Sequence, residues 1–226
     1  MLEDNINVMV RIFSVNNNKN INFKAFKVAE TTNSFKNFPT DINIYKLSAE
    51  DSPFLDKLKK TDYLKLYPKI GEMKLLRWQH IFDYCIFEAK DKLNTTYLAV
   101  SDNKPCAIMI YKDDCAYYLK GICAIPTETN KKVAGAGKTL FYQLFKNIVE
   151  ENKRGAILDA VIDGPFDVVK KYEELGFLED LPSKIIGYST MTCNKFKAAE
   201  QLKKLSASIE YRKCNNEKTD LNQFTD

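Results

Sequence analysis

A short glycine-rich stretch, residues 131–140 (KKVAGAGKTL), has the residue types and the spacing of an anion-binding loop. Gly135 and Gly137 let the backbone turn without a side-chain clash, so that several N–H groups can converge on one ligand. The N–H groups at the start of a helix attract phosphate oxygens. Three lysines in the stretch add positive charge: Lys131, Lys132 and Lys138. The stretch therefore predicts a site for a phosphate or diphosphate group.

Two regular elements must position this loop. The segment AYYLKGICAIP, residues 116–126, is apolar enough for a buried strand and ends directly before the loop. After the loop, apolar residues recur with helical spacing: Leu140, Phe141, Leu144, Phe145, Ile148 and Val149. The loop is therefore expected at the N-terminus of an amphipathic helix, where the helix dipole favours an anion.

One interpretation of the string GAGKT is the end of a nucleotide-binding P-loop. That motif requires a glycine five residues before Gly137, and Lys132 occupies this position. No apolar strand ends in an aspartate that is a convincing magnesium partner. A nucleotide-binding protein is the alternative of lesser weight.

Two other motifs carry a resemblance to a known family. The segment KVAGAG, residues 132–137, is similar to the pyrophosphate loop [Q/R]-x-x-G-x-[G/A] of the GCN5-related N-acetyltransferase (GNAT) family, with lysine at its first position. YEELGF, residues 172–177, closely resembles the Y-x-x-L-G-F motif that follows the fifth strand in that family. Pro126 resembles the proline that closes the fourth strand. An asparagine often found before the second motif is absent, and Gly164-Pro165 occupies that region.

The resemblance covers roughly residues 42–193 and implies both a fold and a reaction. The implied fold is α/β, with a mixed, mostly antiparallel sheet, splayed parallel central strands 4 and 5, and helices on both faces. The implied reaction is direct transfer of an acetyl group from acetyl-CoA to a primary amine. The resemblance places the pantetheine arm along Ile122, Cys123 and Ala124. It places the diphosphate on these loop residues: Lys132, Val133, Ala134, Gly135, Ala136, Gly137, Lys138 and Thr139.

The resemblance implies that Tyr172 protonates the departing thiolate, because the unperturbed tyrosine pKa of about 10 keeps the hydroxyl protonated at neutral pH. An aromatic residue packed in the core is the other interpretation of Tyr172. The general base stays unassigned, since the expected fourth strand carries Lys120 and no carboxylate. Asp159, Asp163 and Glu128 are candidates. The missing carboxylate also leaves open a catalytically decayed CoA-binding module that serves regulation or interaction.

The chain is expected to divide into three segments. Residues 1–40 form an N-terminal extension, in which two apolar runs flank the polar run NNNKN and predict a β-hairpin. Residues 41–193 form the acetyltransferase domain. Residues 194–226 give one further helix and a polar tail that is expected to be mobile. The apolar face of the hairpin suggests packing on the core or a homodimer.

Composition limits the other possibilities. The 226 residues carry 34 Lys and Arg and 30 Asp and Glu, a balance too even for a nucleic-acid-binding protein. Six cysteines without a C-x-x-C pair indicate free thiols in a reducing compartment, and we expect a cytoplasmic protein. No apolar run approaches the roughly 20 residues that span a membrane. The one histidine, His80, makes a zinc site improbable, and no metal is expected. The expected partner is an amine-bearing small molecule or protein.

Overall fold

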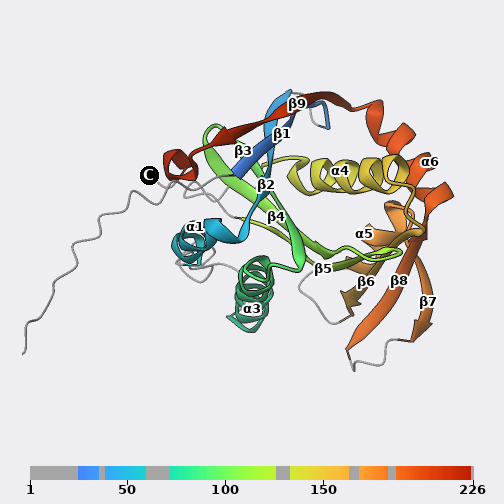
Figure 1. Cartoon of the computed structure of the whole chain (residues 1–226). Coiled ribbons are helices and arrows are strands. Elements are labelled where there is room, and N and C mark those ends of the chain that lie inside the picture. Colours follow the sequence, from blue (N-terminus) through green and yellow to red (C-terminus); the bar gives the residue numbers. More distant parts are fainter. Residues whose placement is uncertain are drawn as a thin grey trace, which may run out of the picture.

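The structure of the chain is a computed structural model. It describes residues 25–35, 39–59, 72–125, 133–162, 168–182 and 187–224. Within these residues a nine-stranded sheet forms the centre of the molecule and helices cover both of its faces (Figure 1).

The sheet has the spatial order β7-β8-β6-β5-β4-β3-β2-β1-β9. The first five strands along the chain are β1 (Ala25–Asn33), β2 (Thr40–Leu47), β3 (Asn94–Ser101), β4 (Lys104–Lys112) and β5 (Tyr117–Ala124). The other four are β6 (Gly155–Val161), β7 (Leu178–Pro182), β8 (Tyr188–Asn194) and β9 (Ile209–Thr219). The turn between β3 and β4 uses Asp102 and Asn103, both at positive φ, as polar turn residues commonly do.

One pair of strands is parallel and the other pairs are antiparallel. β5 pairs with β6 in parallel register at Tyr117, Tyr118 and Leu119, at the start of both strands. β5 then continues to Ala124 and β6 to Val161, beyond the paired positions. The two central strands therefore separate toward their carboxyl ends. The predicted mixed sheet with a splayed parallel pair is confirmed.

The helices lie in two layers. α4 (Ala136–Glu150) packs on one face, with α6 (Lys195–Ser206) against it, and the short α5 (Val168–Glu174) follows β6. α1 (Ser52–Leu58) and α3 (Glu72–Ala89) lie on the other face, α3 against β5 (Figure 1). The short 3-10 helix η1 (Ala49–Asp51) directly precedes α1. A second 3-10 helix, η2 (Leu221–Phe224), is the last element of the described chain.

Each face of the sheet has its own apolar core, since side chains alternate between the faces of a strand. The core under α4 includes Leu140, Leu144 and Phe145, which form the apolar stripe expected from the sequence. The core under α3 includes Phe82, Cys85 and Cys123. α3 approaches β5 so closely that a Cβ atom at Gly121 would lie 2.6 Å from the Cys85 Sγ atom. Gly121 therefore fixes the distance between α3 and the central strand.

The two ends of the chain differ from the expectation. A mobile polar tail is expected over residues 211–226, but residues 209–219 form the edge strand β9, which pairs antiparallel with β1. The expectation of a mobile tail is wrong because backbone pairing, and not side-chain periodicity, holds this strand: most of its side chains are exposed. Of the expected hairpin, the run over residues 6–15 lies outside the described residues. The second run overlaps β1, which lies in the main sheet between β2 and β9. In the described residues, the three expected segments therefore share one sheet.

In the part of the chain that the structure describes, no helix has the length and apolar character needed to cross a membrane.

Deletion of residues 1–39 is expected to destabilise the protein strongly. This truncation removes β1 and exposes the edges of β2 and β9, so that β9 loses its partner. We expect the midpoint of thermal unfolding to fall by at least roughly 10 °C, since each kcal/mol corresponds to about 2–4 °C in a chain of this size. Deletion of residues 1–24 is the control because it leaves β1 in place. Equal melting temperatures for the two truncations, measured by calorimetry, would contradict the placement of β1.

Candidate functional site

The glycine loop is confirmed as the N-terminus of a helix. α4 begins at Ala136, and its N-cap residue Gly135 has a φ of 83°, in the left-handed region that favours glycine. The Thr139 N–H donates to the Gly135 carbonyl oxygen at 2.8 Å, which is the first intrahelical bond. The N–H groups of Gly137 and Lys138 precede this bond and have no acceptor within the helix. They are free to bind an anion.

The space in front of this helix turn is open. A Cβ atom built on Gly137 would meet nothing within 4 Å in the described structure. A Cβ atom on Gly135, in contrast, would lie 2.5 Å from the Phe35 ring. Gly135 is therefore required by packing and by its φ angle, whereas Gly137 leaves room for a ligand.

Not every residue of the expected loop is placed to bind. Lys131 and Lys132 lie outside the described residues. Val133 packs against the core under α4, while the Lys138 side chain is exposed and its Nζ atom lies 4.9 Å from the centroid of the Phe35 ring. Ala134 and Gly135 form the turn before the helix, and Ala136 is buried.

Thr139 is the exception among the expected ligands. Its side chain is fully buried, its N–H group is used in the first helical bond, and its hydroxyl group donates to the Gly135 carbonyl oxygen at 3.0 Å. The same hydroxyl oxygen accepts a hydrogen bond from the Asn33 Nδ2 atom at 2.7 Å. The expectation that Thr139 contacts the diphosphate is therefore wrong, because all of its polar groups are directed into the protein.

The expected pantetheine segment lies on the part of β5 that has separated from β6. Ile122, Cys123 and Ala124 pair with β4 on one side, at Met109, Ile108 and Ala107. On the other side they lie beyond Leu119, the last residue in register with β6. Lys120 is the extra residue of a β-bulge, since Leu119 and Gly121 pair with the consecutive residues Tyr111 and Ile110. The bulge lies where the two strands begin to separate.

Tyr172 lies on α5, the short helix that follows β6. Its ring packs edge-on against Phe141 of α4 and Phe177, at centroid distances of 5.9 and 6.0 Å. Although the side chain is only partly buried, its hydroxyl end is enclosed by protein. Burial, and then the nearby thiols of Cys85 and Cys123, raise the pKa of Tyr172. Both thiols belong to the core under α3, whereas the Tyr172 ring packs against the core under α4.

A second polar cluster lies on the α3 face of the sheet, beside the point of separation. The Asp159 carboxylate on β6 accepts a hydrogen bond from the Thr190 hydroxyl at 2.7 Å and another from the Tyr118 hydroxyl. Burial, followed by the bond to Asp159, raises the pKa of Tyr118 to about 12. The Lys120 Nζ atom lies 5.3 Å from the centroid of the Tyr118 ring. Asp159, one of the three base candidates, is therefore held among hydroxyl groups.

The other candidates are placed as follows. Glu128, Asp163, Pro126 and Gly164-Pro165 lie outside the described residues. His80 is exposed on α3. None of the six cysteines forms a disulfide, and four of them are buried. Among the described residues, no three His, Cys, Asp or Glu side chains gather where they could hold a metal ion.

Four residues around the site could not be identified from motifs in the sequence: Asn33, Phe35, Tyr118 and Thr190. Asn33 and Phe35 contact the loop from a strand about 100 residues away, and no motif marks them. Tyr118 and Thr190 join Asp159 only because β5, β6 and β8 are neighbours in the sheet. The alternation of side chains along a strand places Tyr118 and Lys120 on one face of β5. This part of the cluster could therefore be predicted from the sequence.

Comparisons with known proteins give likenesses of structure only. No family model matches the sequence, and a search of curated proteins finds no match. An uncharacterised protein from Bacillus halodurans has a TM-score of 0.52 and 10% identity, over 80% of this chain and 98% of that chain. This likeness concerns the fold.

Two solved acetyltransferase structures are also similar. The PaiA N-acetyltransferase from Thermoplasma acidophilum, in complex with coenzyme A, has a TM-score of 0.48 and 16% identity, over 68% of this chain and 98% of that chain. A chimera of the spermidine N-acetyltransferase SpeG from Vibrio cholerae with hSSAT has a TM-score of 0.47 and 16% identity, over 70% and 98% of the two chains.

Proposed function

We propose that this chain is an acetyl-CoA-dependent N-acetyltransferase that transfers the acetyl group directly to a primary amine. The observation that carries the proposal is the separation of β5 from β6 after Leu119, in a sheet covered by the helix that the glycine loop opens. The glycine loop offers an anion site on one face of the splayed strand pair, and polar side chains lie on the other face. A thioester and an amine could therefore reach the gap between β5 and β6 from different sides.

The residues present fit the coenzyme. The N–H groups of Gly137 and Lys138 and the open space at Gly137 suit a diphosphate, and the exposed Lys138 adds a positive charge. We assign the pantetheine arm to the edge of β5 at Ile122, Cys123 and Ala124. Lys132 is a further proposed contact. Bound acetyl-CoA would supply an activated acyl group with a thiolate as its leaving group.

The reaction requires two proton transfers. A C–N bond forms between the amine nitrogen and the acyl carbon, the C–S bond breaks, the nitrogen loses a proton, and the sulfur gains one. We assign the proton donor to Tyr172, whose raised pKa keeps its hydroxyl protonated at neutral pH. We assign the proton acceptor to Asp159, directly or through one water molecule. The two groups lie on different elements, so that neither must do both tasks.

Replacement of Asp159 by asparagine is expected to lower kcat by roughly ten- to a hundredfold, because the amide keeps the side-chain size but cannot accept the proton. The affinity for acetyl-CoA, which binds at the loop, should change less than twofold. The matched control is Asp180→Asn on the exposed part of β7. Unchanged kcat in a folded Asp159→Asn variant, measured by release of the CoA thiol, would remove Asp159 from the mechanism.

The proposed function is tested by thiol release from acetyl-CoA in the presence of a panel of amines. The panel contains small primary amines, a polyamine, a lysine-containing peptide and a peptide with a free N-terminus. Amine-dependent thiol release supports the enzyme. Tight CoA binding without turnover of any amine would favour the decayed CoA-binding module. Magnesium-dependent ATP binding without CoA binding would favour the nucleotide-binding alternative.

The six free thiols support a reducing compartment, and we propose the cytoplasm. The proposed partner is an amine-bearing small molecule or protein, with no role for nucleic acid or membrane. A homodimer, suggested by the apolar residues of the N-terminal segment, is part of the proposal and is tested by light scattering.

A further inference from the structure

The added strand β1 ends at the glycine loop. In the described sheet, β1 and β9 lie outside β2, where the strands covered by the family resemblance begin. Asn33, the last residue of β1, donates from its Nδ2 atom to the Thr139 hydroxyl, and two residues later the Phe35 ring contacts the position of Gly135. Two successive parts of this segment therefore touch the first turn of α4.

The Asn33 amide is buried at a cost. Only 1% of Asn33 is exposed, and its Oδ1 atom has no hydrogen-bond partner within the described residues. A buried acceptor without a partner lowers stability, so an apolar residue would serve the fold better. A requirement for its Nδ2 donor at Thr139 explains the presence of the amide.

The hydrogen bonds form a chain that reaches the N-cap. Asn33 donates to the Thr139 hydroxyl, which donates in turn to the Gly135 carbonyl oxygen, the same oxygen that accepts the Thr139 N–H. Gly135 is the residue that turns the backbone into α4. The orientation of the free N–H groups at Gly137 and Lys138 therefore depends on a contact with β1.

Strand β9 holds the same helix further along. The Tyr211 hydroxyl donates to the Gln143 Oε1 atom at 2.9 Å, and the Tyr211 ring lies 5.3 Å from the ring of Tyr142. The added strands thus contact α4 at its first turn and again about one turn later. The additions to the sheet are placed to fix the helix that carries the anion site.

We propose that Asn33 is a positioning residue for the coenzyme site, and that it acts through Thr139 to fix the phosphate-binding turn. The inference rests on the proposed function, since the ligand is the diphosphate of CoA. Asn33 makes no contact with the ligand in this account. Its effect is to hold the N–H groups in the orientation that binds the ligand, which lowers the cost of binding.

A double-mutant cycle tests the inference. Asn33→Ala and Thr139→Val should each raise the dissociation constant of CoA by roughly three- to tenfold, the effect of one hydrogen bond, and the double variant should be no weaker than the single ones. Thr139→Ser, which keeps the hydroxyl, should bind CoA like the wild type. The value of kcat at saturating acetyl-CoA should be unchanged, because the chemical groups remain. Isothermal titration calorimetry measures the binding.

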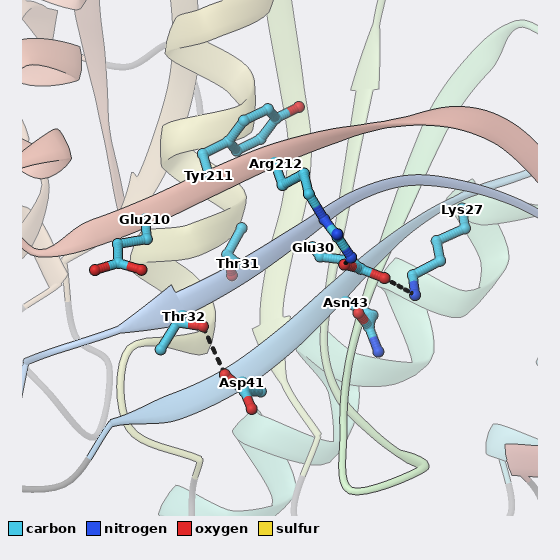
Figure 2. Close-up of a pocket in the computed structure, with 9 residues that line it drawn as sticks. All are labelled: Lys27, Glu30, Thr31, Thr32, Asp41, Asn43, Glu210, Tyr211 and Arg212. Atoms are coloured by element: carbon cyan, nitrogen blue, oxygen red, sulfur yellow. Dashed lines mark hydrogen bonds and ion pairs between the residues drawn. The ribbon is translucent and has the colours of Figure 1, made fainter.

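The control comes from the same strand. Thr32 points to the other face of β1, where its hydroxyl donates to Asp41 at 2.6 Å in a polar pocket of about 580 Å³ (Figure 2). In that pocket, Glu30 forms ion pairs with both Lys27 and Arg212. Thr32→Ala removes a hydrogen bond of β1 without touching the loop, so its CoA affinity should equal that of the wild type.

A second measurement does not depend on CoA. In the ligand-free protein, amide hydrogen exchange at Thr139 should become at least about tenfold faster in Asn33→Ala, while Thr32→Ala leaves it unchanged. If the wild type fails to bind CoA, the proposed function fails, and the exchange rates still decide the role of Asn33. Additive losses of affinity in the double variant, or unchanged exchange at Thr139, would overturn the inference.

Discussion

Replacement of Gly137 by valine is expected to weaken acetyl-CoA binding at least about tenfold, or about 1.4 kcal/mol, while the protein stays folded. The added side chain would fill the open space in front of the first turn of α4, where the diphosphate is proposed to bind. Valine also suits a helix better than glycine does, so the free energy of unfolding should not fall. Calorimetric titration measures the affinity, and thermal unfolding checks the fold.

A matched control is available on another helix. Ala199 is exposed on α6, and Ala199→Val places a branched side chain on a helix surface away from the loop. Its CoA affinity should equal that of the wild type. Unchanged affinity in a folded Gly137→Val variant would show that the diphosphate does not bind at this turn.

The Tyr172→Phe variant is expected to lose roughly ten- to a thousandfold in kcat, with acetyl-CoA binding little changed. Phenylalanine keeps the ring that packs on Phe141 and Phe177, and it removes the hydroxyl that is proposed to donate the proton. The thiolate would then have to take its proton from water. Because the pKa of Tyr172 is raised, loss of its proton should not limit the wild-type rate near neutral pH. Steady-state rates with a saturating amine measure the effect.

The control for the hydroxyl is Tyr45→Phe. Tyr45 is buried in the core under α3, and its ring packs on Phe224 near the end of the described chain. This variant should keep full activity. If Tyr172→Phe also keeps full activity and stability, Tyr172 is a core residue and water is the proton donor.

Much of the fold could be predicted from the sequence because its patterns are local. The apolar stripe of α4, the strands before and after it, and Gly135 at the helix start each follow from residues close in sequence. The role of β9 could not be predicted, since its side chains are mostly exposed and show no alternation. Pairing with β1, almost 200 residues earlier in the chain, makes it a strand.

The candidate site likewise contains residues that local motifs predict and residues that only the fold brings together. Gly137 and Tyr172 belong to short motifs, and the structure places them near the same helix. Asn33 reaches Thr139 only through the order of the strands, which the sequence does not display. The resemblance places the diphosphate on Thr139, although a residue at this point of a helix already has an acceptor for its N–H.

Calorimetric titration of the wild-type chain with acetyl-CoA is the direct test of whether the glycine loop binds coenzyme A. We expect one binding site per chain, with an affinity that falls as salt is added, because screening weakens attraction between the lysines and the phosphates. Magnesium ATP should not compete. Absence of acetyl-CoA binding by the folded chain, or tight binding of magnesium ATP in its place, would show that the loop is not a coenzyme A site.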